Sequence, residues 1–240
     1  MAFVGDPVHR FFQMWQQVDG GRHDLFVWVG LTSGEGSAGH HEDPSLSTNQ
    51  GSLAMGFYNM AAGDAPYLRE LAERYALADN YHQPIMGGTG ANYFALATGY
   101  VASYGIDGQP ATPPANQIEN PEPRPGTVNW YTQSGYAGGS YVNCADPRQP
   151  GVKAIRDQLA ALPYKPFNAG NCLPGRYYLV NNYRPGYAPD GTPKPLGPSE
   201  FTLPPQQQKT IAEALSEKGV SWKWYSGGRT ADGIDRDQYC

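Results

Sequence analysis

The sequence has few charged residues and no long apolar run. Asp, Glu, Lys and Arg make up only 16% of the 240 residues, and 22 acidic side chains outnumber 17 basic ones. This balance excludes the clustered basic surface with which proteins bind nucleic acid. No apolar stretch reaches the roughly 20 residues of a transmembrane helix. The opening MAFVGDPVHR also lacks the apolar core of a signal peptide.

Cysteine is scarce as well. The three residues, Cys144, Cys172 and Cys240, do not have the paired spacing of zinc ligands. Cys144 and Cys172 lie in similar polar, turn-rich surroundings, YVNCADP and AGNCLPG, so we expect a disulfide between them; two unrelated free thiols are the alternative. In the chain-entropy model this bond stabilises the fold by roughly 3 to 4 kcal/mol.

Glycine, proline and tyrosine are abundant, at 30, 22 and 17 residues, which is typical of a loop-rich globular protein. Helical periodicity with helix-end signals predicts five helices, over residues 7–18, 66–76, 91–99, 151–162 and 211–218. In the last of them Ile211, Ala214 and Leu215 are expected to be buried. Strands are predicted over residues 24–31 (or an apolar turn), 126–131, 176–183 and 220–225. The segment 33–52, which contains HHED, is best interpreted as a solvated loop.

The bend MGGTGAN, residues 86–92, holds a single hydroxyl, Thr89, among three glycines. It is neither a P-loop nor a dinucleotide fingerprint. Its glycines allow a tight turn and the close approach of a substrate. A helix that starts near Gly90 favours an anion beside Thr89, but threonine attacks only with a base or a metal to activate it. The residues alone leave a nucleophile and an ordinary turn as alternatives, with the turn favoured.

Several stretches together resemble the bacterial phosphoesterases, which include phospholipases C and acid phosphatases. They occur in family order: GDPVHRFFQMWQQVDGGRHDLFVW (5–28), MGFYNM (55–60), LRELAERYALADNYHQPIMGGTGAN (68–92), NCADPRQPGVKAI (143–155), YYLVNNYRPGY (177–187) and IAEALSEKGVSWKWY (211–225). The resemblance implies an α/β fold, a three-layer α/β/α sandwich of alkaline-phosphatase type, with long Gly/Pro-rich loops. It also implies a phosphate ester substrate, lipid or small molecule, and a divalent metal ion of unknown identity.

The resemblance also assigns the site residues. Thr89 takes the position of the nucleophile and touches the metal, Asn92 helps to hold the phosphoryl oxygens, and His9 lies near the phosphoryl group. Many relatives read GGSFLNH at the bend, so Gly90 and Tyr93 predict a different pocket wall. Asp79 and Asn80 are interpreted as turn residues.

Relatives open with a strand that bears a Glu-Asn metal-binding pair, and they continue past residue 225 to acidic and histidine residues. We therefore expect residues 1–240 to form one partial phosphoesterase domain. The other metal ligands and the partner of Cys240 are expected outside this chain, which then has little activity alone. Because relatives are usually exported, the resemblance also implies a secreted or periplasmic protein.

Other functions stay open at this point. The tyrosines and five tryptophans suit a secreted, non-catalytic module that binds carbohydrate or a protein. An inactive fragment is a further alternative, and so is an esterase acting on carbon esters, although the chain has no GxSxG elbow. The sequence does not distinguish phospholipid, nucleotide and simple phosphomonoester substrates.

Overall fold

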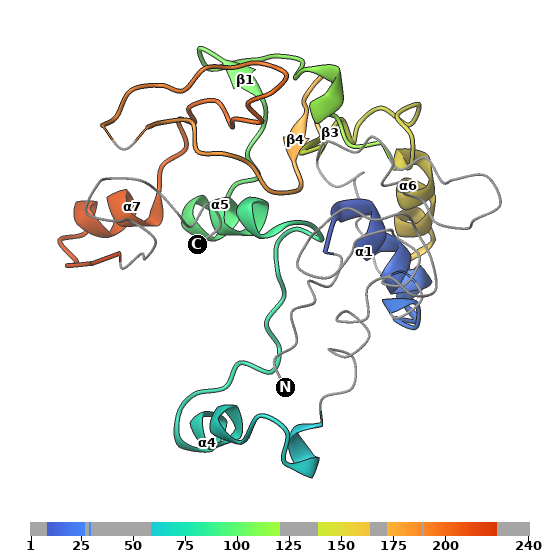
Figure 1. The fold of residues 1–240 in the computed structure, drawn as a ribbon, viewed down its shortest axis with the longest axis vertical. Helices are drawn as coiled ribbons and strands as arrows, with labels where there is room; N and C mark the ends of the chain where they lie inside the picture. The colour runs from blue at the N-terminus through green and yellow to red at the C-terminus, as the bar shows by residue number, and fades with distance from the viewer. Residues whose placement is uncertain are drawn as a thin grey trace. The chain divides into compact units, whose positions relative to one another are not determined.

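The computed structural model describes residues 9–26, 29, 59–120, 139–163, 172–188 and 190–224. By its contacts the chain divides into two units, residues 1–83 with 122–135 and residues 84–121 with 136–240. Among the described elements, α1 and α4 belong to the first unit, and α5, α6, α7 and the four strands belong to the second (Figure 1).

Helix α1 spans Phe11–Val18 and confirms the first predicted helix over the described residues. It ends at Asp19, whose left-handed φ of 44° leads into the 3₁₀ turn Asp19–Gly21, as the sequence DGG predicts. The buried side chains of α1 are those of Phe12, Gln13, Gln16 and Gln17. Three of these are amides, so the buried face is more polar than the apolar periodicity predicts.

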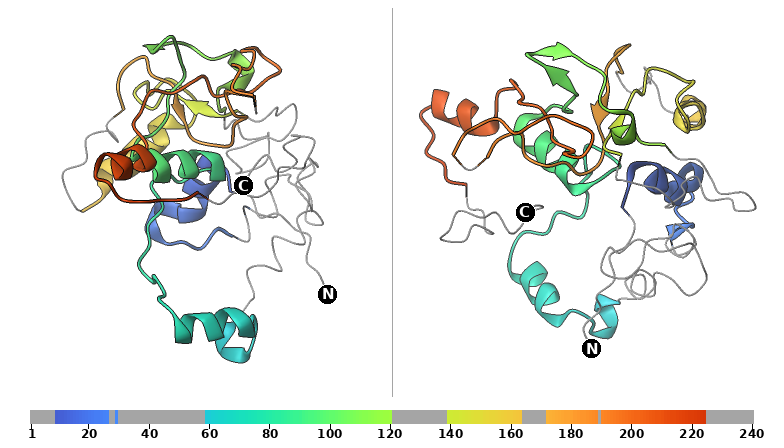
Figure 2. Two further views of the ribbon diagram at one scale, coloured as in Figure 1. Left: turned by 90° about the vertical axis from the view of Figure 1, so that its left-hand side faces the viewer. Right: turned by 45° about the horizontal axis from the view of Figure 1, so that its top comes forward.

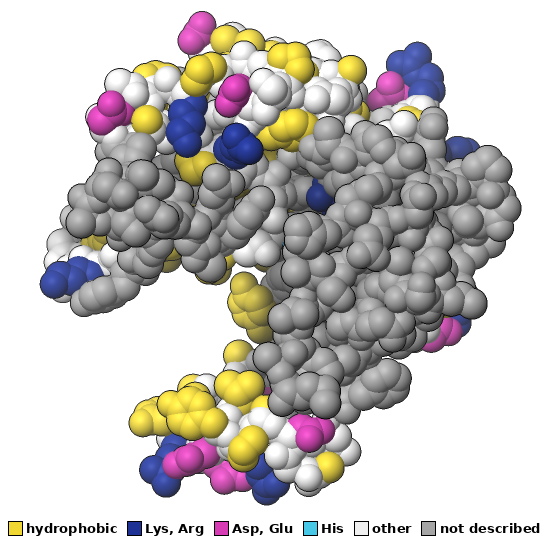
Figure 3. All heavy atoms as spheres, in the orientation of Figure 1, with side chains coloured by type: hydrophobic (Ala, Val, Ile, Leu, Met, Phe, Trp, Pro, Cys, Tyr) yellow, Lys and Arg dark blue, Asp and Glu magenta, His cyan; other side chains and the backbone are white. Residues whose placement is uncertain are grey.

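Helix α4, Pro66–Arg74, follows the 3₁₀ turn Met60–Ala62 and has proline in its first turn, as expected. The predicted pair between Glu70 and Arg74 is present at 3.0 Å on the exposed surface. The apolar residues of this segment are largely exposed, with Leu68 at 59% and Tyr75 at 71%. Figure 3 shows hydrophobic side chains gathered on the surface here, beside charged ones.

The core of the second unit is built around a small sheet. Strands β3, Tyr141–Val142, and β4, Tyr178–Leu179, pair antiparallel. Single bridges extend the sheet on both sides, from Ser103 to Tyr178 and from Ile118 to Tyr141. Strand β4 confirms part of the predicted strand 176–183, whereas residues 126–131 lie outside the described residues.

A separate hairpin pairs β1, Gly105–Ile106, with β2, Gln109–Pro110. Its two-residue turn consists of Asp107 and Gly108, both with positive φ, at 50° and 77°. Such a turn suits the twist of antiparallel strands, and Asp-Gly is a favoured pair for it.

Helix α5, Thr89–Thr98, packs its small residues against the sheet. The hydrophobic core there consists of Ile85, Ala91, Ala95, Ala102, Tyr104, Tyr141, Leu179 and Leu203. The rings of Tyr104 and Tyr141 meet edge to face with centroids 5.3 Å apart. The helix ends as predicted at Gly99, whose φ of 71° is left-handed. Helix α7, Ile211–Glu217, lies beside α5 in every view (Figure 2).

Helices α6, Val152–Ala161, and α7 confirm the last two predicted helices. Thr210 and Glu213 form a reciprocal capping box at the start of α7. The predicted burial of α7 is wrong for Ile211, which is 52% exposed, and for Ala214, which is also exposed. The strand predicted from Val220 is also wrong over the described residues 220–224, which pair with no other segment of the described chain.

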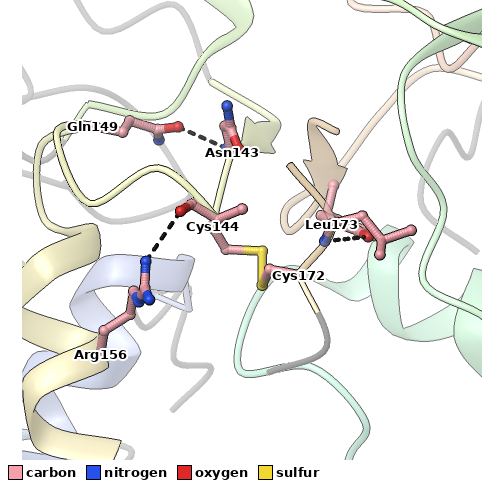
Figure 4. Close-up of a disulfide and its surroundings, with 8 residues drawn as sticks. Asn143, Cys144, Gln149, Arg156, Cys172 and Leu173 are labelled. Carbon is pink, nitrogen blue, oxygen red and sulfur yellow. Dashed lines mark hydrogen bonds between the residues drawn. A yellow bond between two sulfur atoms is a disulfide. The ribbon is translucent and has the colours of Figure 1, made fainter. Parts of the chain in front are cut away.

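The predicted disulfide between Cys144 and Cys172 is confirmed, with Cα atoms 5.6 Å apart. Figure 4 shows the hydrogen bonds around it. Arg156 of α6 donates to the carbonyl oxygen of Ala145 at 3.0 Å, and the N–H of Leu173 donates to the Tyr178 hydroxyl at 3.1 Å. The disulfide joins the segment that follows β3 to the segment that precedes β4. Cys240 lies outside the described residues.

The described residues thus combine sparse helices with short strands. They do not show the predicted α/β/α sandwich, because the described strands are two residues long and form two separate antiparallel pairs. No helix in the described ranges is long and apolar enough to span a bilayer.

Candidate active site

The glycine bend lies directly against the segment that follows β4. The N–H of Gly88 donates to the carbonyl oxygen of Val180 at 2.9 Å. The N–H of Gly90 donates to the side-chain oxygen of Asn182 at 2.7 Å. These two bonds join residues about 90 positions apart and fix the start of α5 against the sheet.

Close packing accounts for the three glycines of the bend. A Cβ atom at Gly87 would lie 1.8 Å from the Val180 oxygen, and one at Gly88 would lie 2.8 Å from the Asn182 nitrogen. At Gly90 it would lie 3.0 Å from the ring of Tyr183. None of the three has a positive φ. The glycines are therefore required by the approach of residues 180–183, a reason that the local sequence does not reveal.

Thr89 is the first residue of α5, and its side chain is exposed. Its hydroxyl makes no hydrogen bond to any other residue that the structure describes. The N–H groups of Thr89 and Ala91 likewise have no acceptor in this part of the chain, and they lie at the positive end of the helix dipole. An exposed hydroxyl thus stands at the N-terminus of a helix, where the helix dipole favours an anion, although Ala91 itself is only 1% exposed.

Asn92 lies one turn into α5 and holds the bend together. Its amide donates to the carbonyl oxygens of Ile85 at 3.0 Å, Gly88 at 3.2 Å and Gly87 at 3.3 Å. Its side-chain oxygen accepts the N–H of Ile85 at 3.2 Å. These bonds give Asn92 a structural role, while its predicted role in holding phosphoryl oxygens stays a prediction.

Replacement of Asn92 by alanine is expected to lower the free energy of unfolding by about 2 kcal/mol or more, because several part-buried backbone groups lose their partners together. Urea denaturation followed by circular dichroism measures this change. Asn116→Ala is the matched control, since the exposed Asn116 amide makes a single bond, to the Pro198 carbonyl oxygen at 2.8 Å. Equal denaturation midpoints for the two variants would contradict the structural role.

Tyr183 covers the start of α5 next to Gly90. Its ring belongs to the partly buried shell around the core, and burial raises the pKa of its hydroxyl above the ordinary value. Tyr183 is therefore neutral at pH 7 and adds no negative charge beside Thr89. Tyr93 is 44% exposed on α5.

The other predicted residues lie on other segments of the chain. His9 lies just before α1 in the first unit, whereas Thr89 and Asn92 share the first turn of α5 in the second. The place of His9 beside the phosphoryl group thus stays a prediction. Asn80, interpreted as a turn residue, is exposed and bonds to His82 at 2.8 Å.

The described residues do not provide a complete site for the divalent metal that the resemblance implies. No cluster of three or more His, Cys, Asp or Glu side chains suited to a metal occurs among them. Thr89 is therefore the one ligand expected from the resemblance that the described residues provide.

Sequence reasoning missed one residue at this site, Asn182. The pair Asn181–Asn182 follows a predicted strand directly, and polar residues at the end of a strand are the signal that points to it. The partner of the Asn182 side chain, the N–H of Gly90, lies 92 positions away. Nothing in the local sequence indicates that contact.

Comparison with protein-family models identifies the class of protein to which this chain belongs. The phosphoesterase family matches residues 1–239, so the chain belongs to that family, the family of phospholipases C and acid phosphatases. It is accordingly a hydrolase that acts on phosphate esters. No curated protein matches the chain, and no solved structure does.

Proposed function

We propose that the chain hydrolyses phosphate esters through Thr89, as a phosphatase or a phospholipase C. The observation that carries the proposal is the exposed hydroxyl of Thr89 at the start of α5, within a chain of the phosphoesterase family. The Thr89 oxygen attacks phosphorus, the alcohol of the substrate leaves, and water then hydrolyses the phosphothreonine.

The start of α5 supports the transfer of the phosphoryl group. The N–H groups of the first turn of α5 would face the negatively charged oxygens if the phosphoryl group binds at this helix end, and such donors stabilise a transition state by a few kcal/mol each (about 3 kcal/mol in other enzymes). Asn92 and His9 are proposed as further residues at the phosphoryl group, in keeping with the resemblance. His9 would supply or accept a proton there, which requires that it reach Thr89 in the folded protein.

Replacement of Thr89 by alanine tests the proposal directly. We expect the rate of p-nitrophenyl phosphate hydrolysis, measured with Mg²⁺, Mn²⁺, Zn²⁺ or Ca²⁺ and without metal, to fall by about a hundredfold or more, because the attacking oxygen is removed. Thr89→Ser keeps a hydroxyl and should retain activity within about tenfold.

Controls separate the remaining alternatives. Asn116→Ala, remote from Thr89 in sequence and in its contacts, should leave the rate unchanged. A parallel assay with bis(p-nitrophenyl) phosphate distinguishes a diesterase, as in phospholipases C, from a monoesterase. Hydrolysis that persists in Thr89→Ala would refute the nucleophile. The rate of the unmodified chain is expected to be low, because the resemblance implies further metal ligands outside these residues. An unmodified chain that is wholly inactive with every metal would refute hydrolysis by this chain and favour a binding module or an inactive fragment.

A further inference from the structure

We propose that Asn182 is a positioning residue for Thr89, and this inference rests on the proposed function. Asn182 does not react with the substrate. Its side-chain oxygen instead holds the peptide group that joins Thr89 to Gly90. The orientation of the attacking hydroxyl is thereby set from the segment after β4.

The contact acts on Thr89 through the planarity of the peptide bond. The N–H of Gly90 shares its plane with the α-carbon and the carbonyl group of Thr89. A hydrogen bond of 2.7 Å from this N–H to Asn182 therefore fixes the direction in which the α-carbon of Thr89 is held. A shift of about 1 Å in a reacting group lowers a rate by roughly a hundredfold.

Asn182 is itself held firmly. Its carbonyl oxygen accepts the hydroxyl of Ser140 at 2.6 Å. The adjacent Asn181 is buried and donates its amide to the Gly139 oxygen at 3.0 Å. Val180, one residue earlier, accepts the N–H of Gly88 at 2.9 Å. The side chain that accepts from Gly90 is thus carried by a segment, residues 180–182, that is hydrogen-bonded both to residues 139–140 and to the glycine bend.

The side-chain amide of Asn182 has an oxygen and a nitrogen, and substitutions can remove them separately. The oxygen accepts from Gly90, while the nitrogen has no acceptor within the described residues. If positioning is the role, the acceptor is what matters. Asn182→Asp keeps an acceptor oxygen and removes the donor, whereas Asn182→Ala removes both.

Amide hydrogen exchange tests the contact without reference to activity. In the full chain, exchange at Gly90 should be at least about tenfold faster in Asn182→Ala than in the unmodified chain, and within about threefold in Asn182→Asp. The N–H of Leu179, bonded to the Ala102 oxygen at 2.8 Å, should be equally protected in all three and reports general unfolding. Unchanged Gly90 exchange in Asn182→Ala would overturn the contact.

Kinetics test the consequence. We expect Asn182→Ala to lower kcat for p-nitrophenyl phosphate by about a hundredfold with KM within about threefold. Asn182→Asp should retain kcat within about tenfold but have a higher KM, because its carboxylate adds a negative charge near the phosphate. Asn116→Ala, which loses a comparable amide bond far along the chain, should change neither constant. Equal losses of kcat in both Asn182 variants, or a change in KM alone in Asn182→Ala, would overturn the positioning role.

The proposed function can fail separately. If Thr89→Ala retains the hydrolysis, the nucleophile is wrong, whatever Asn182 does. If Thr89→Ala abolishes the hydrolysis and Asn182→Ala keeps kcat within about threefold, the nucleophile stands and the positioning role is wrong.

Discussion

A Gly87→Ala variant is expected to lose about 3 kcal/mol or more of folding free energy. The added carbon would stand 1.8 Å from the carbonyl oxygen of Val180, which is backbone and cannot rotate away. Moving that oxygen also strains its bond with the N–H of Gly88. Urea denaturation followed by circular dichroism gives the free energy of unfolding, and the start of α5 should be the part that is lost first.

Gly197→Ala is the matched control for this substitution. A Cβ atom at Gly197 meets no atom within 4 Å, and its φ is not positive. The free energy of unfolding should therefore stay within about 1 kcal/mol of the unmodified value. If Gly87→Ala unfolds at the same urea concentration as Gly197→Ala, residues 87 and 180 do not approach each other as the structure describes.

Loss of the Cys144–Cys172 disulfide should lower the free energy of unfolding by about 3 to 4 kcal/mol, since the bond closes a loop of 28 residues. The Cys172→Ser variant removes the bond and frees the chain before β4 from the chain after β3. Because β4 leads into Val180 and Asn182, hydrogen exchange at Gly88 and Gly90 should also become faster.

Two comparisons show whether the crosslink itself is responsible. The double variant Cys144→Ser/Cys172→Ser should unfold at the same urea concentration as Cys172→Ser, and so should the unmodified chain in excess dithiothreitol. A reduced chain as stable as the oxidised one would contradict the prediction. A double variant more stable than Cys172→Ser would indicate that the unpaired Cys144 thiol itself destabilises the single variant.

The helices were predictable because their signals are local. Gly99 ends α5 with a left-handed φ, Pro66 opens α4, and Thr210 with Glu213 caps α7. Each of these residues acts within one turn of the helix it ends or begins. Apolar periodicity located the helices as well, but it does not say what a face packs against, as the exposed Ile211 shows.

The strands were less predictable because a strand needs a partner. Residues 220–224 alternate as a strand does, yet they pair with no segment among the described residues. The two residues of β4, in contrast, pair with β3 about 37 positions earlier. Pairing over such distances depends on the whole chain, and short runs of apolar residues do not specify it.

The candidate site was predictable only in part, because some of its features are local and others depend on distant residues. The bend and its single hydroxyl stand out in the sequence, and Thr89 is exposed at a helix start. The reason for the glycines was not visible in the local sequence. Cβ atoms at these positions would crowd Val180, Asn182 and Tyr183, which are distant in the sequence. The catalytic roles of Thr89, Asn92 and His9 stay predictions for the assays to test.

The close approach of Tyr183 to Gly90 constrains any redesign of this part of the chain. A Cβ atom at position 90 would lie 3.0 Å from the Tyr183 ring, so a side chain there requires that the ring shift or be replaced by a smaller one. Positions 90 and 183 are therefore best changed as a pair when the start of α5 is redesigned.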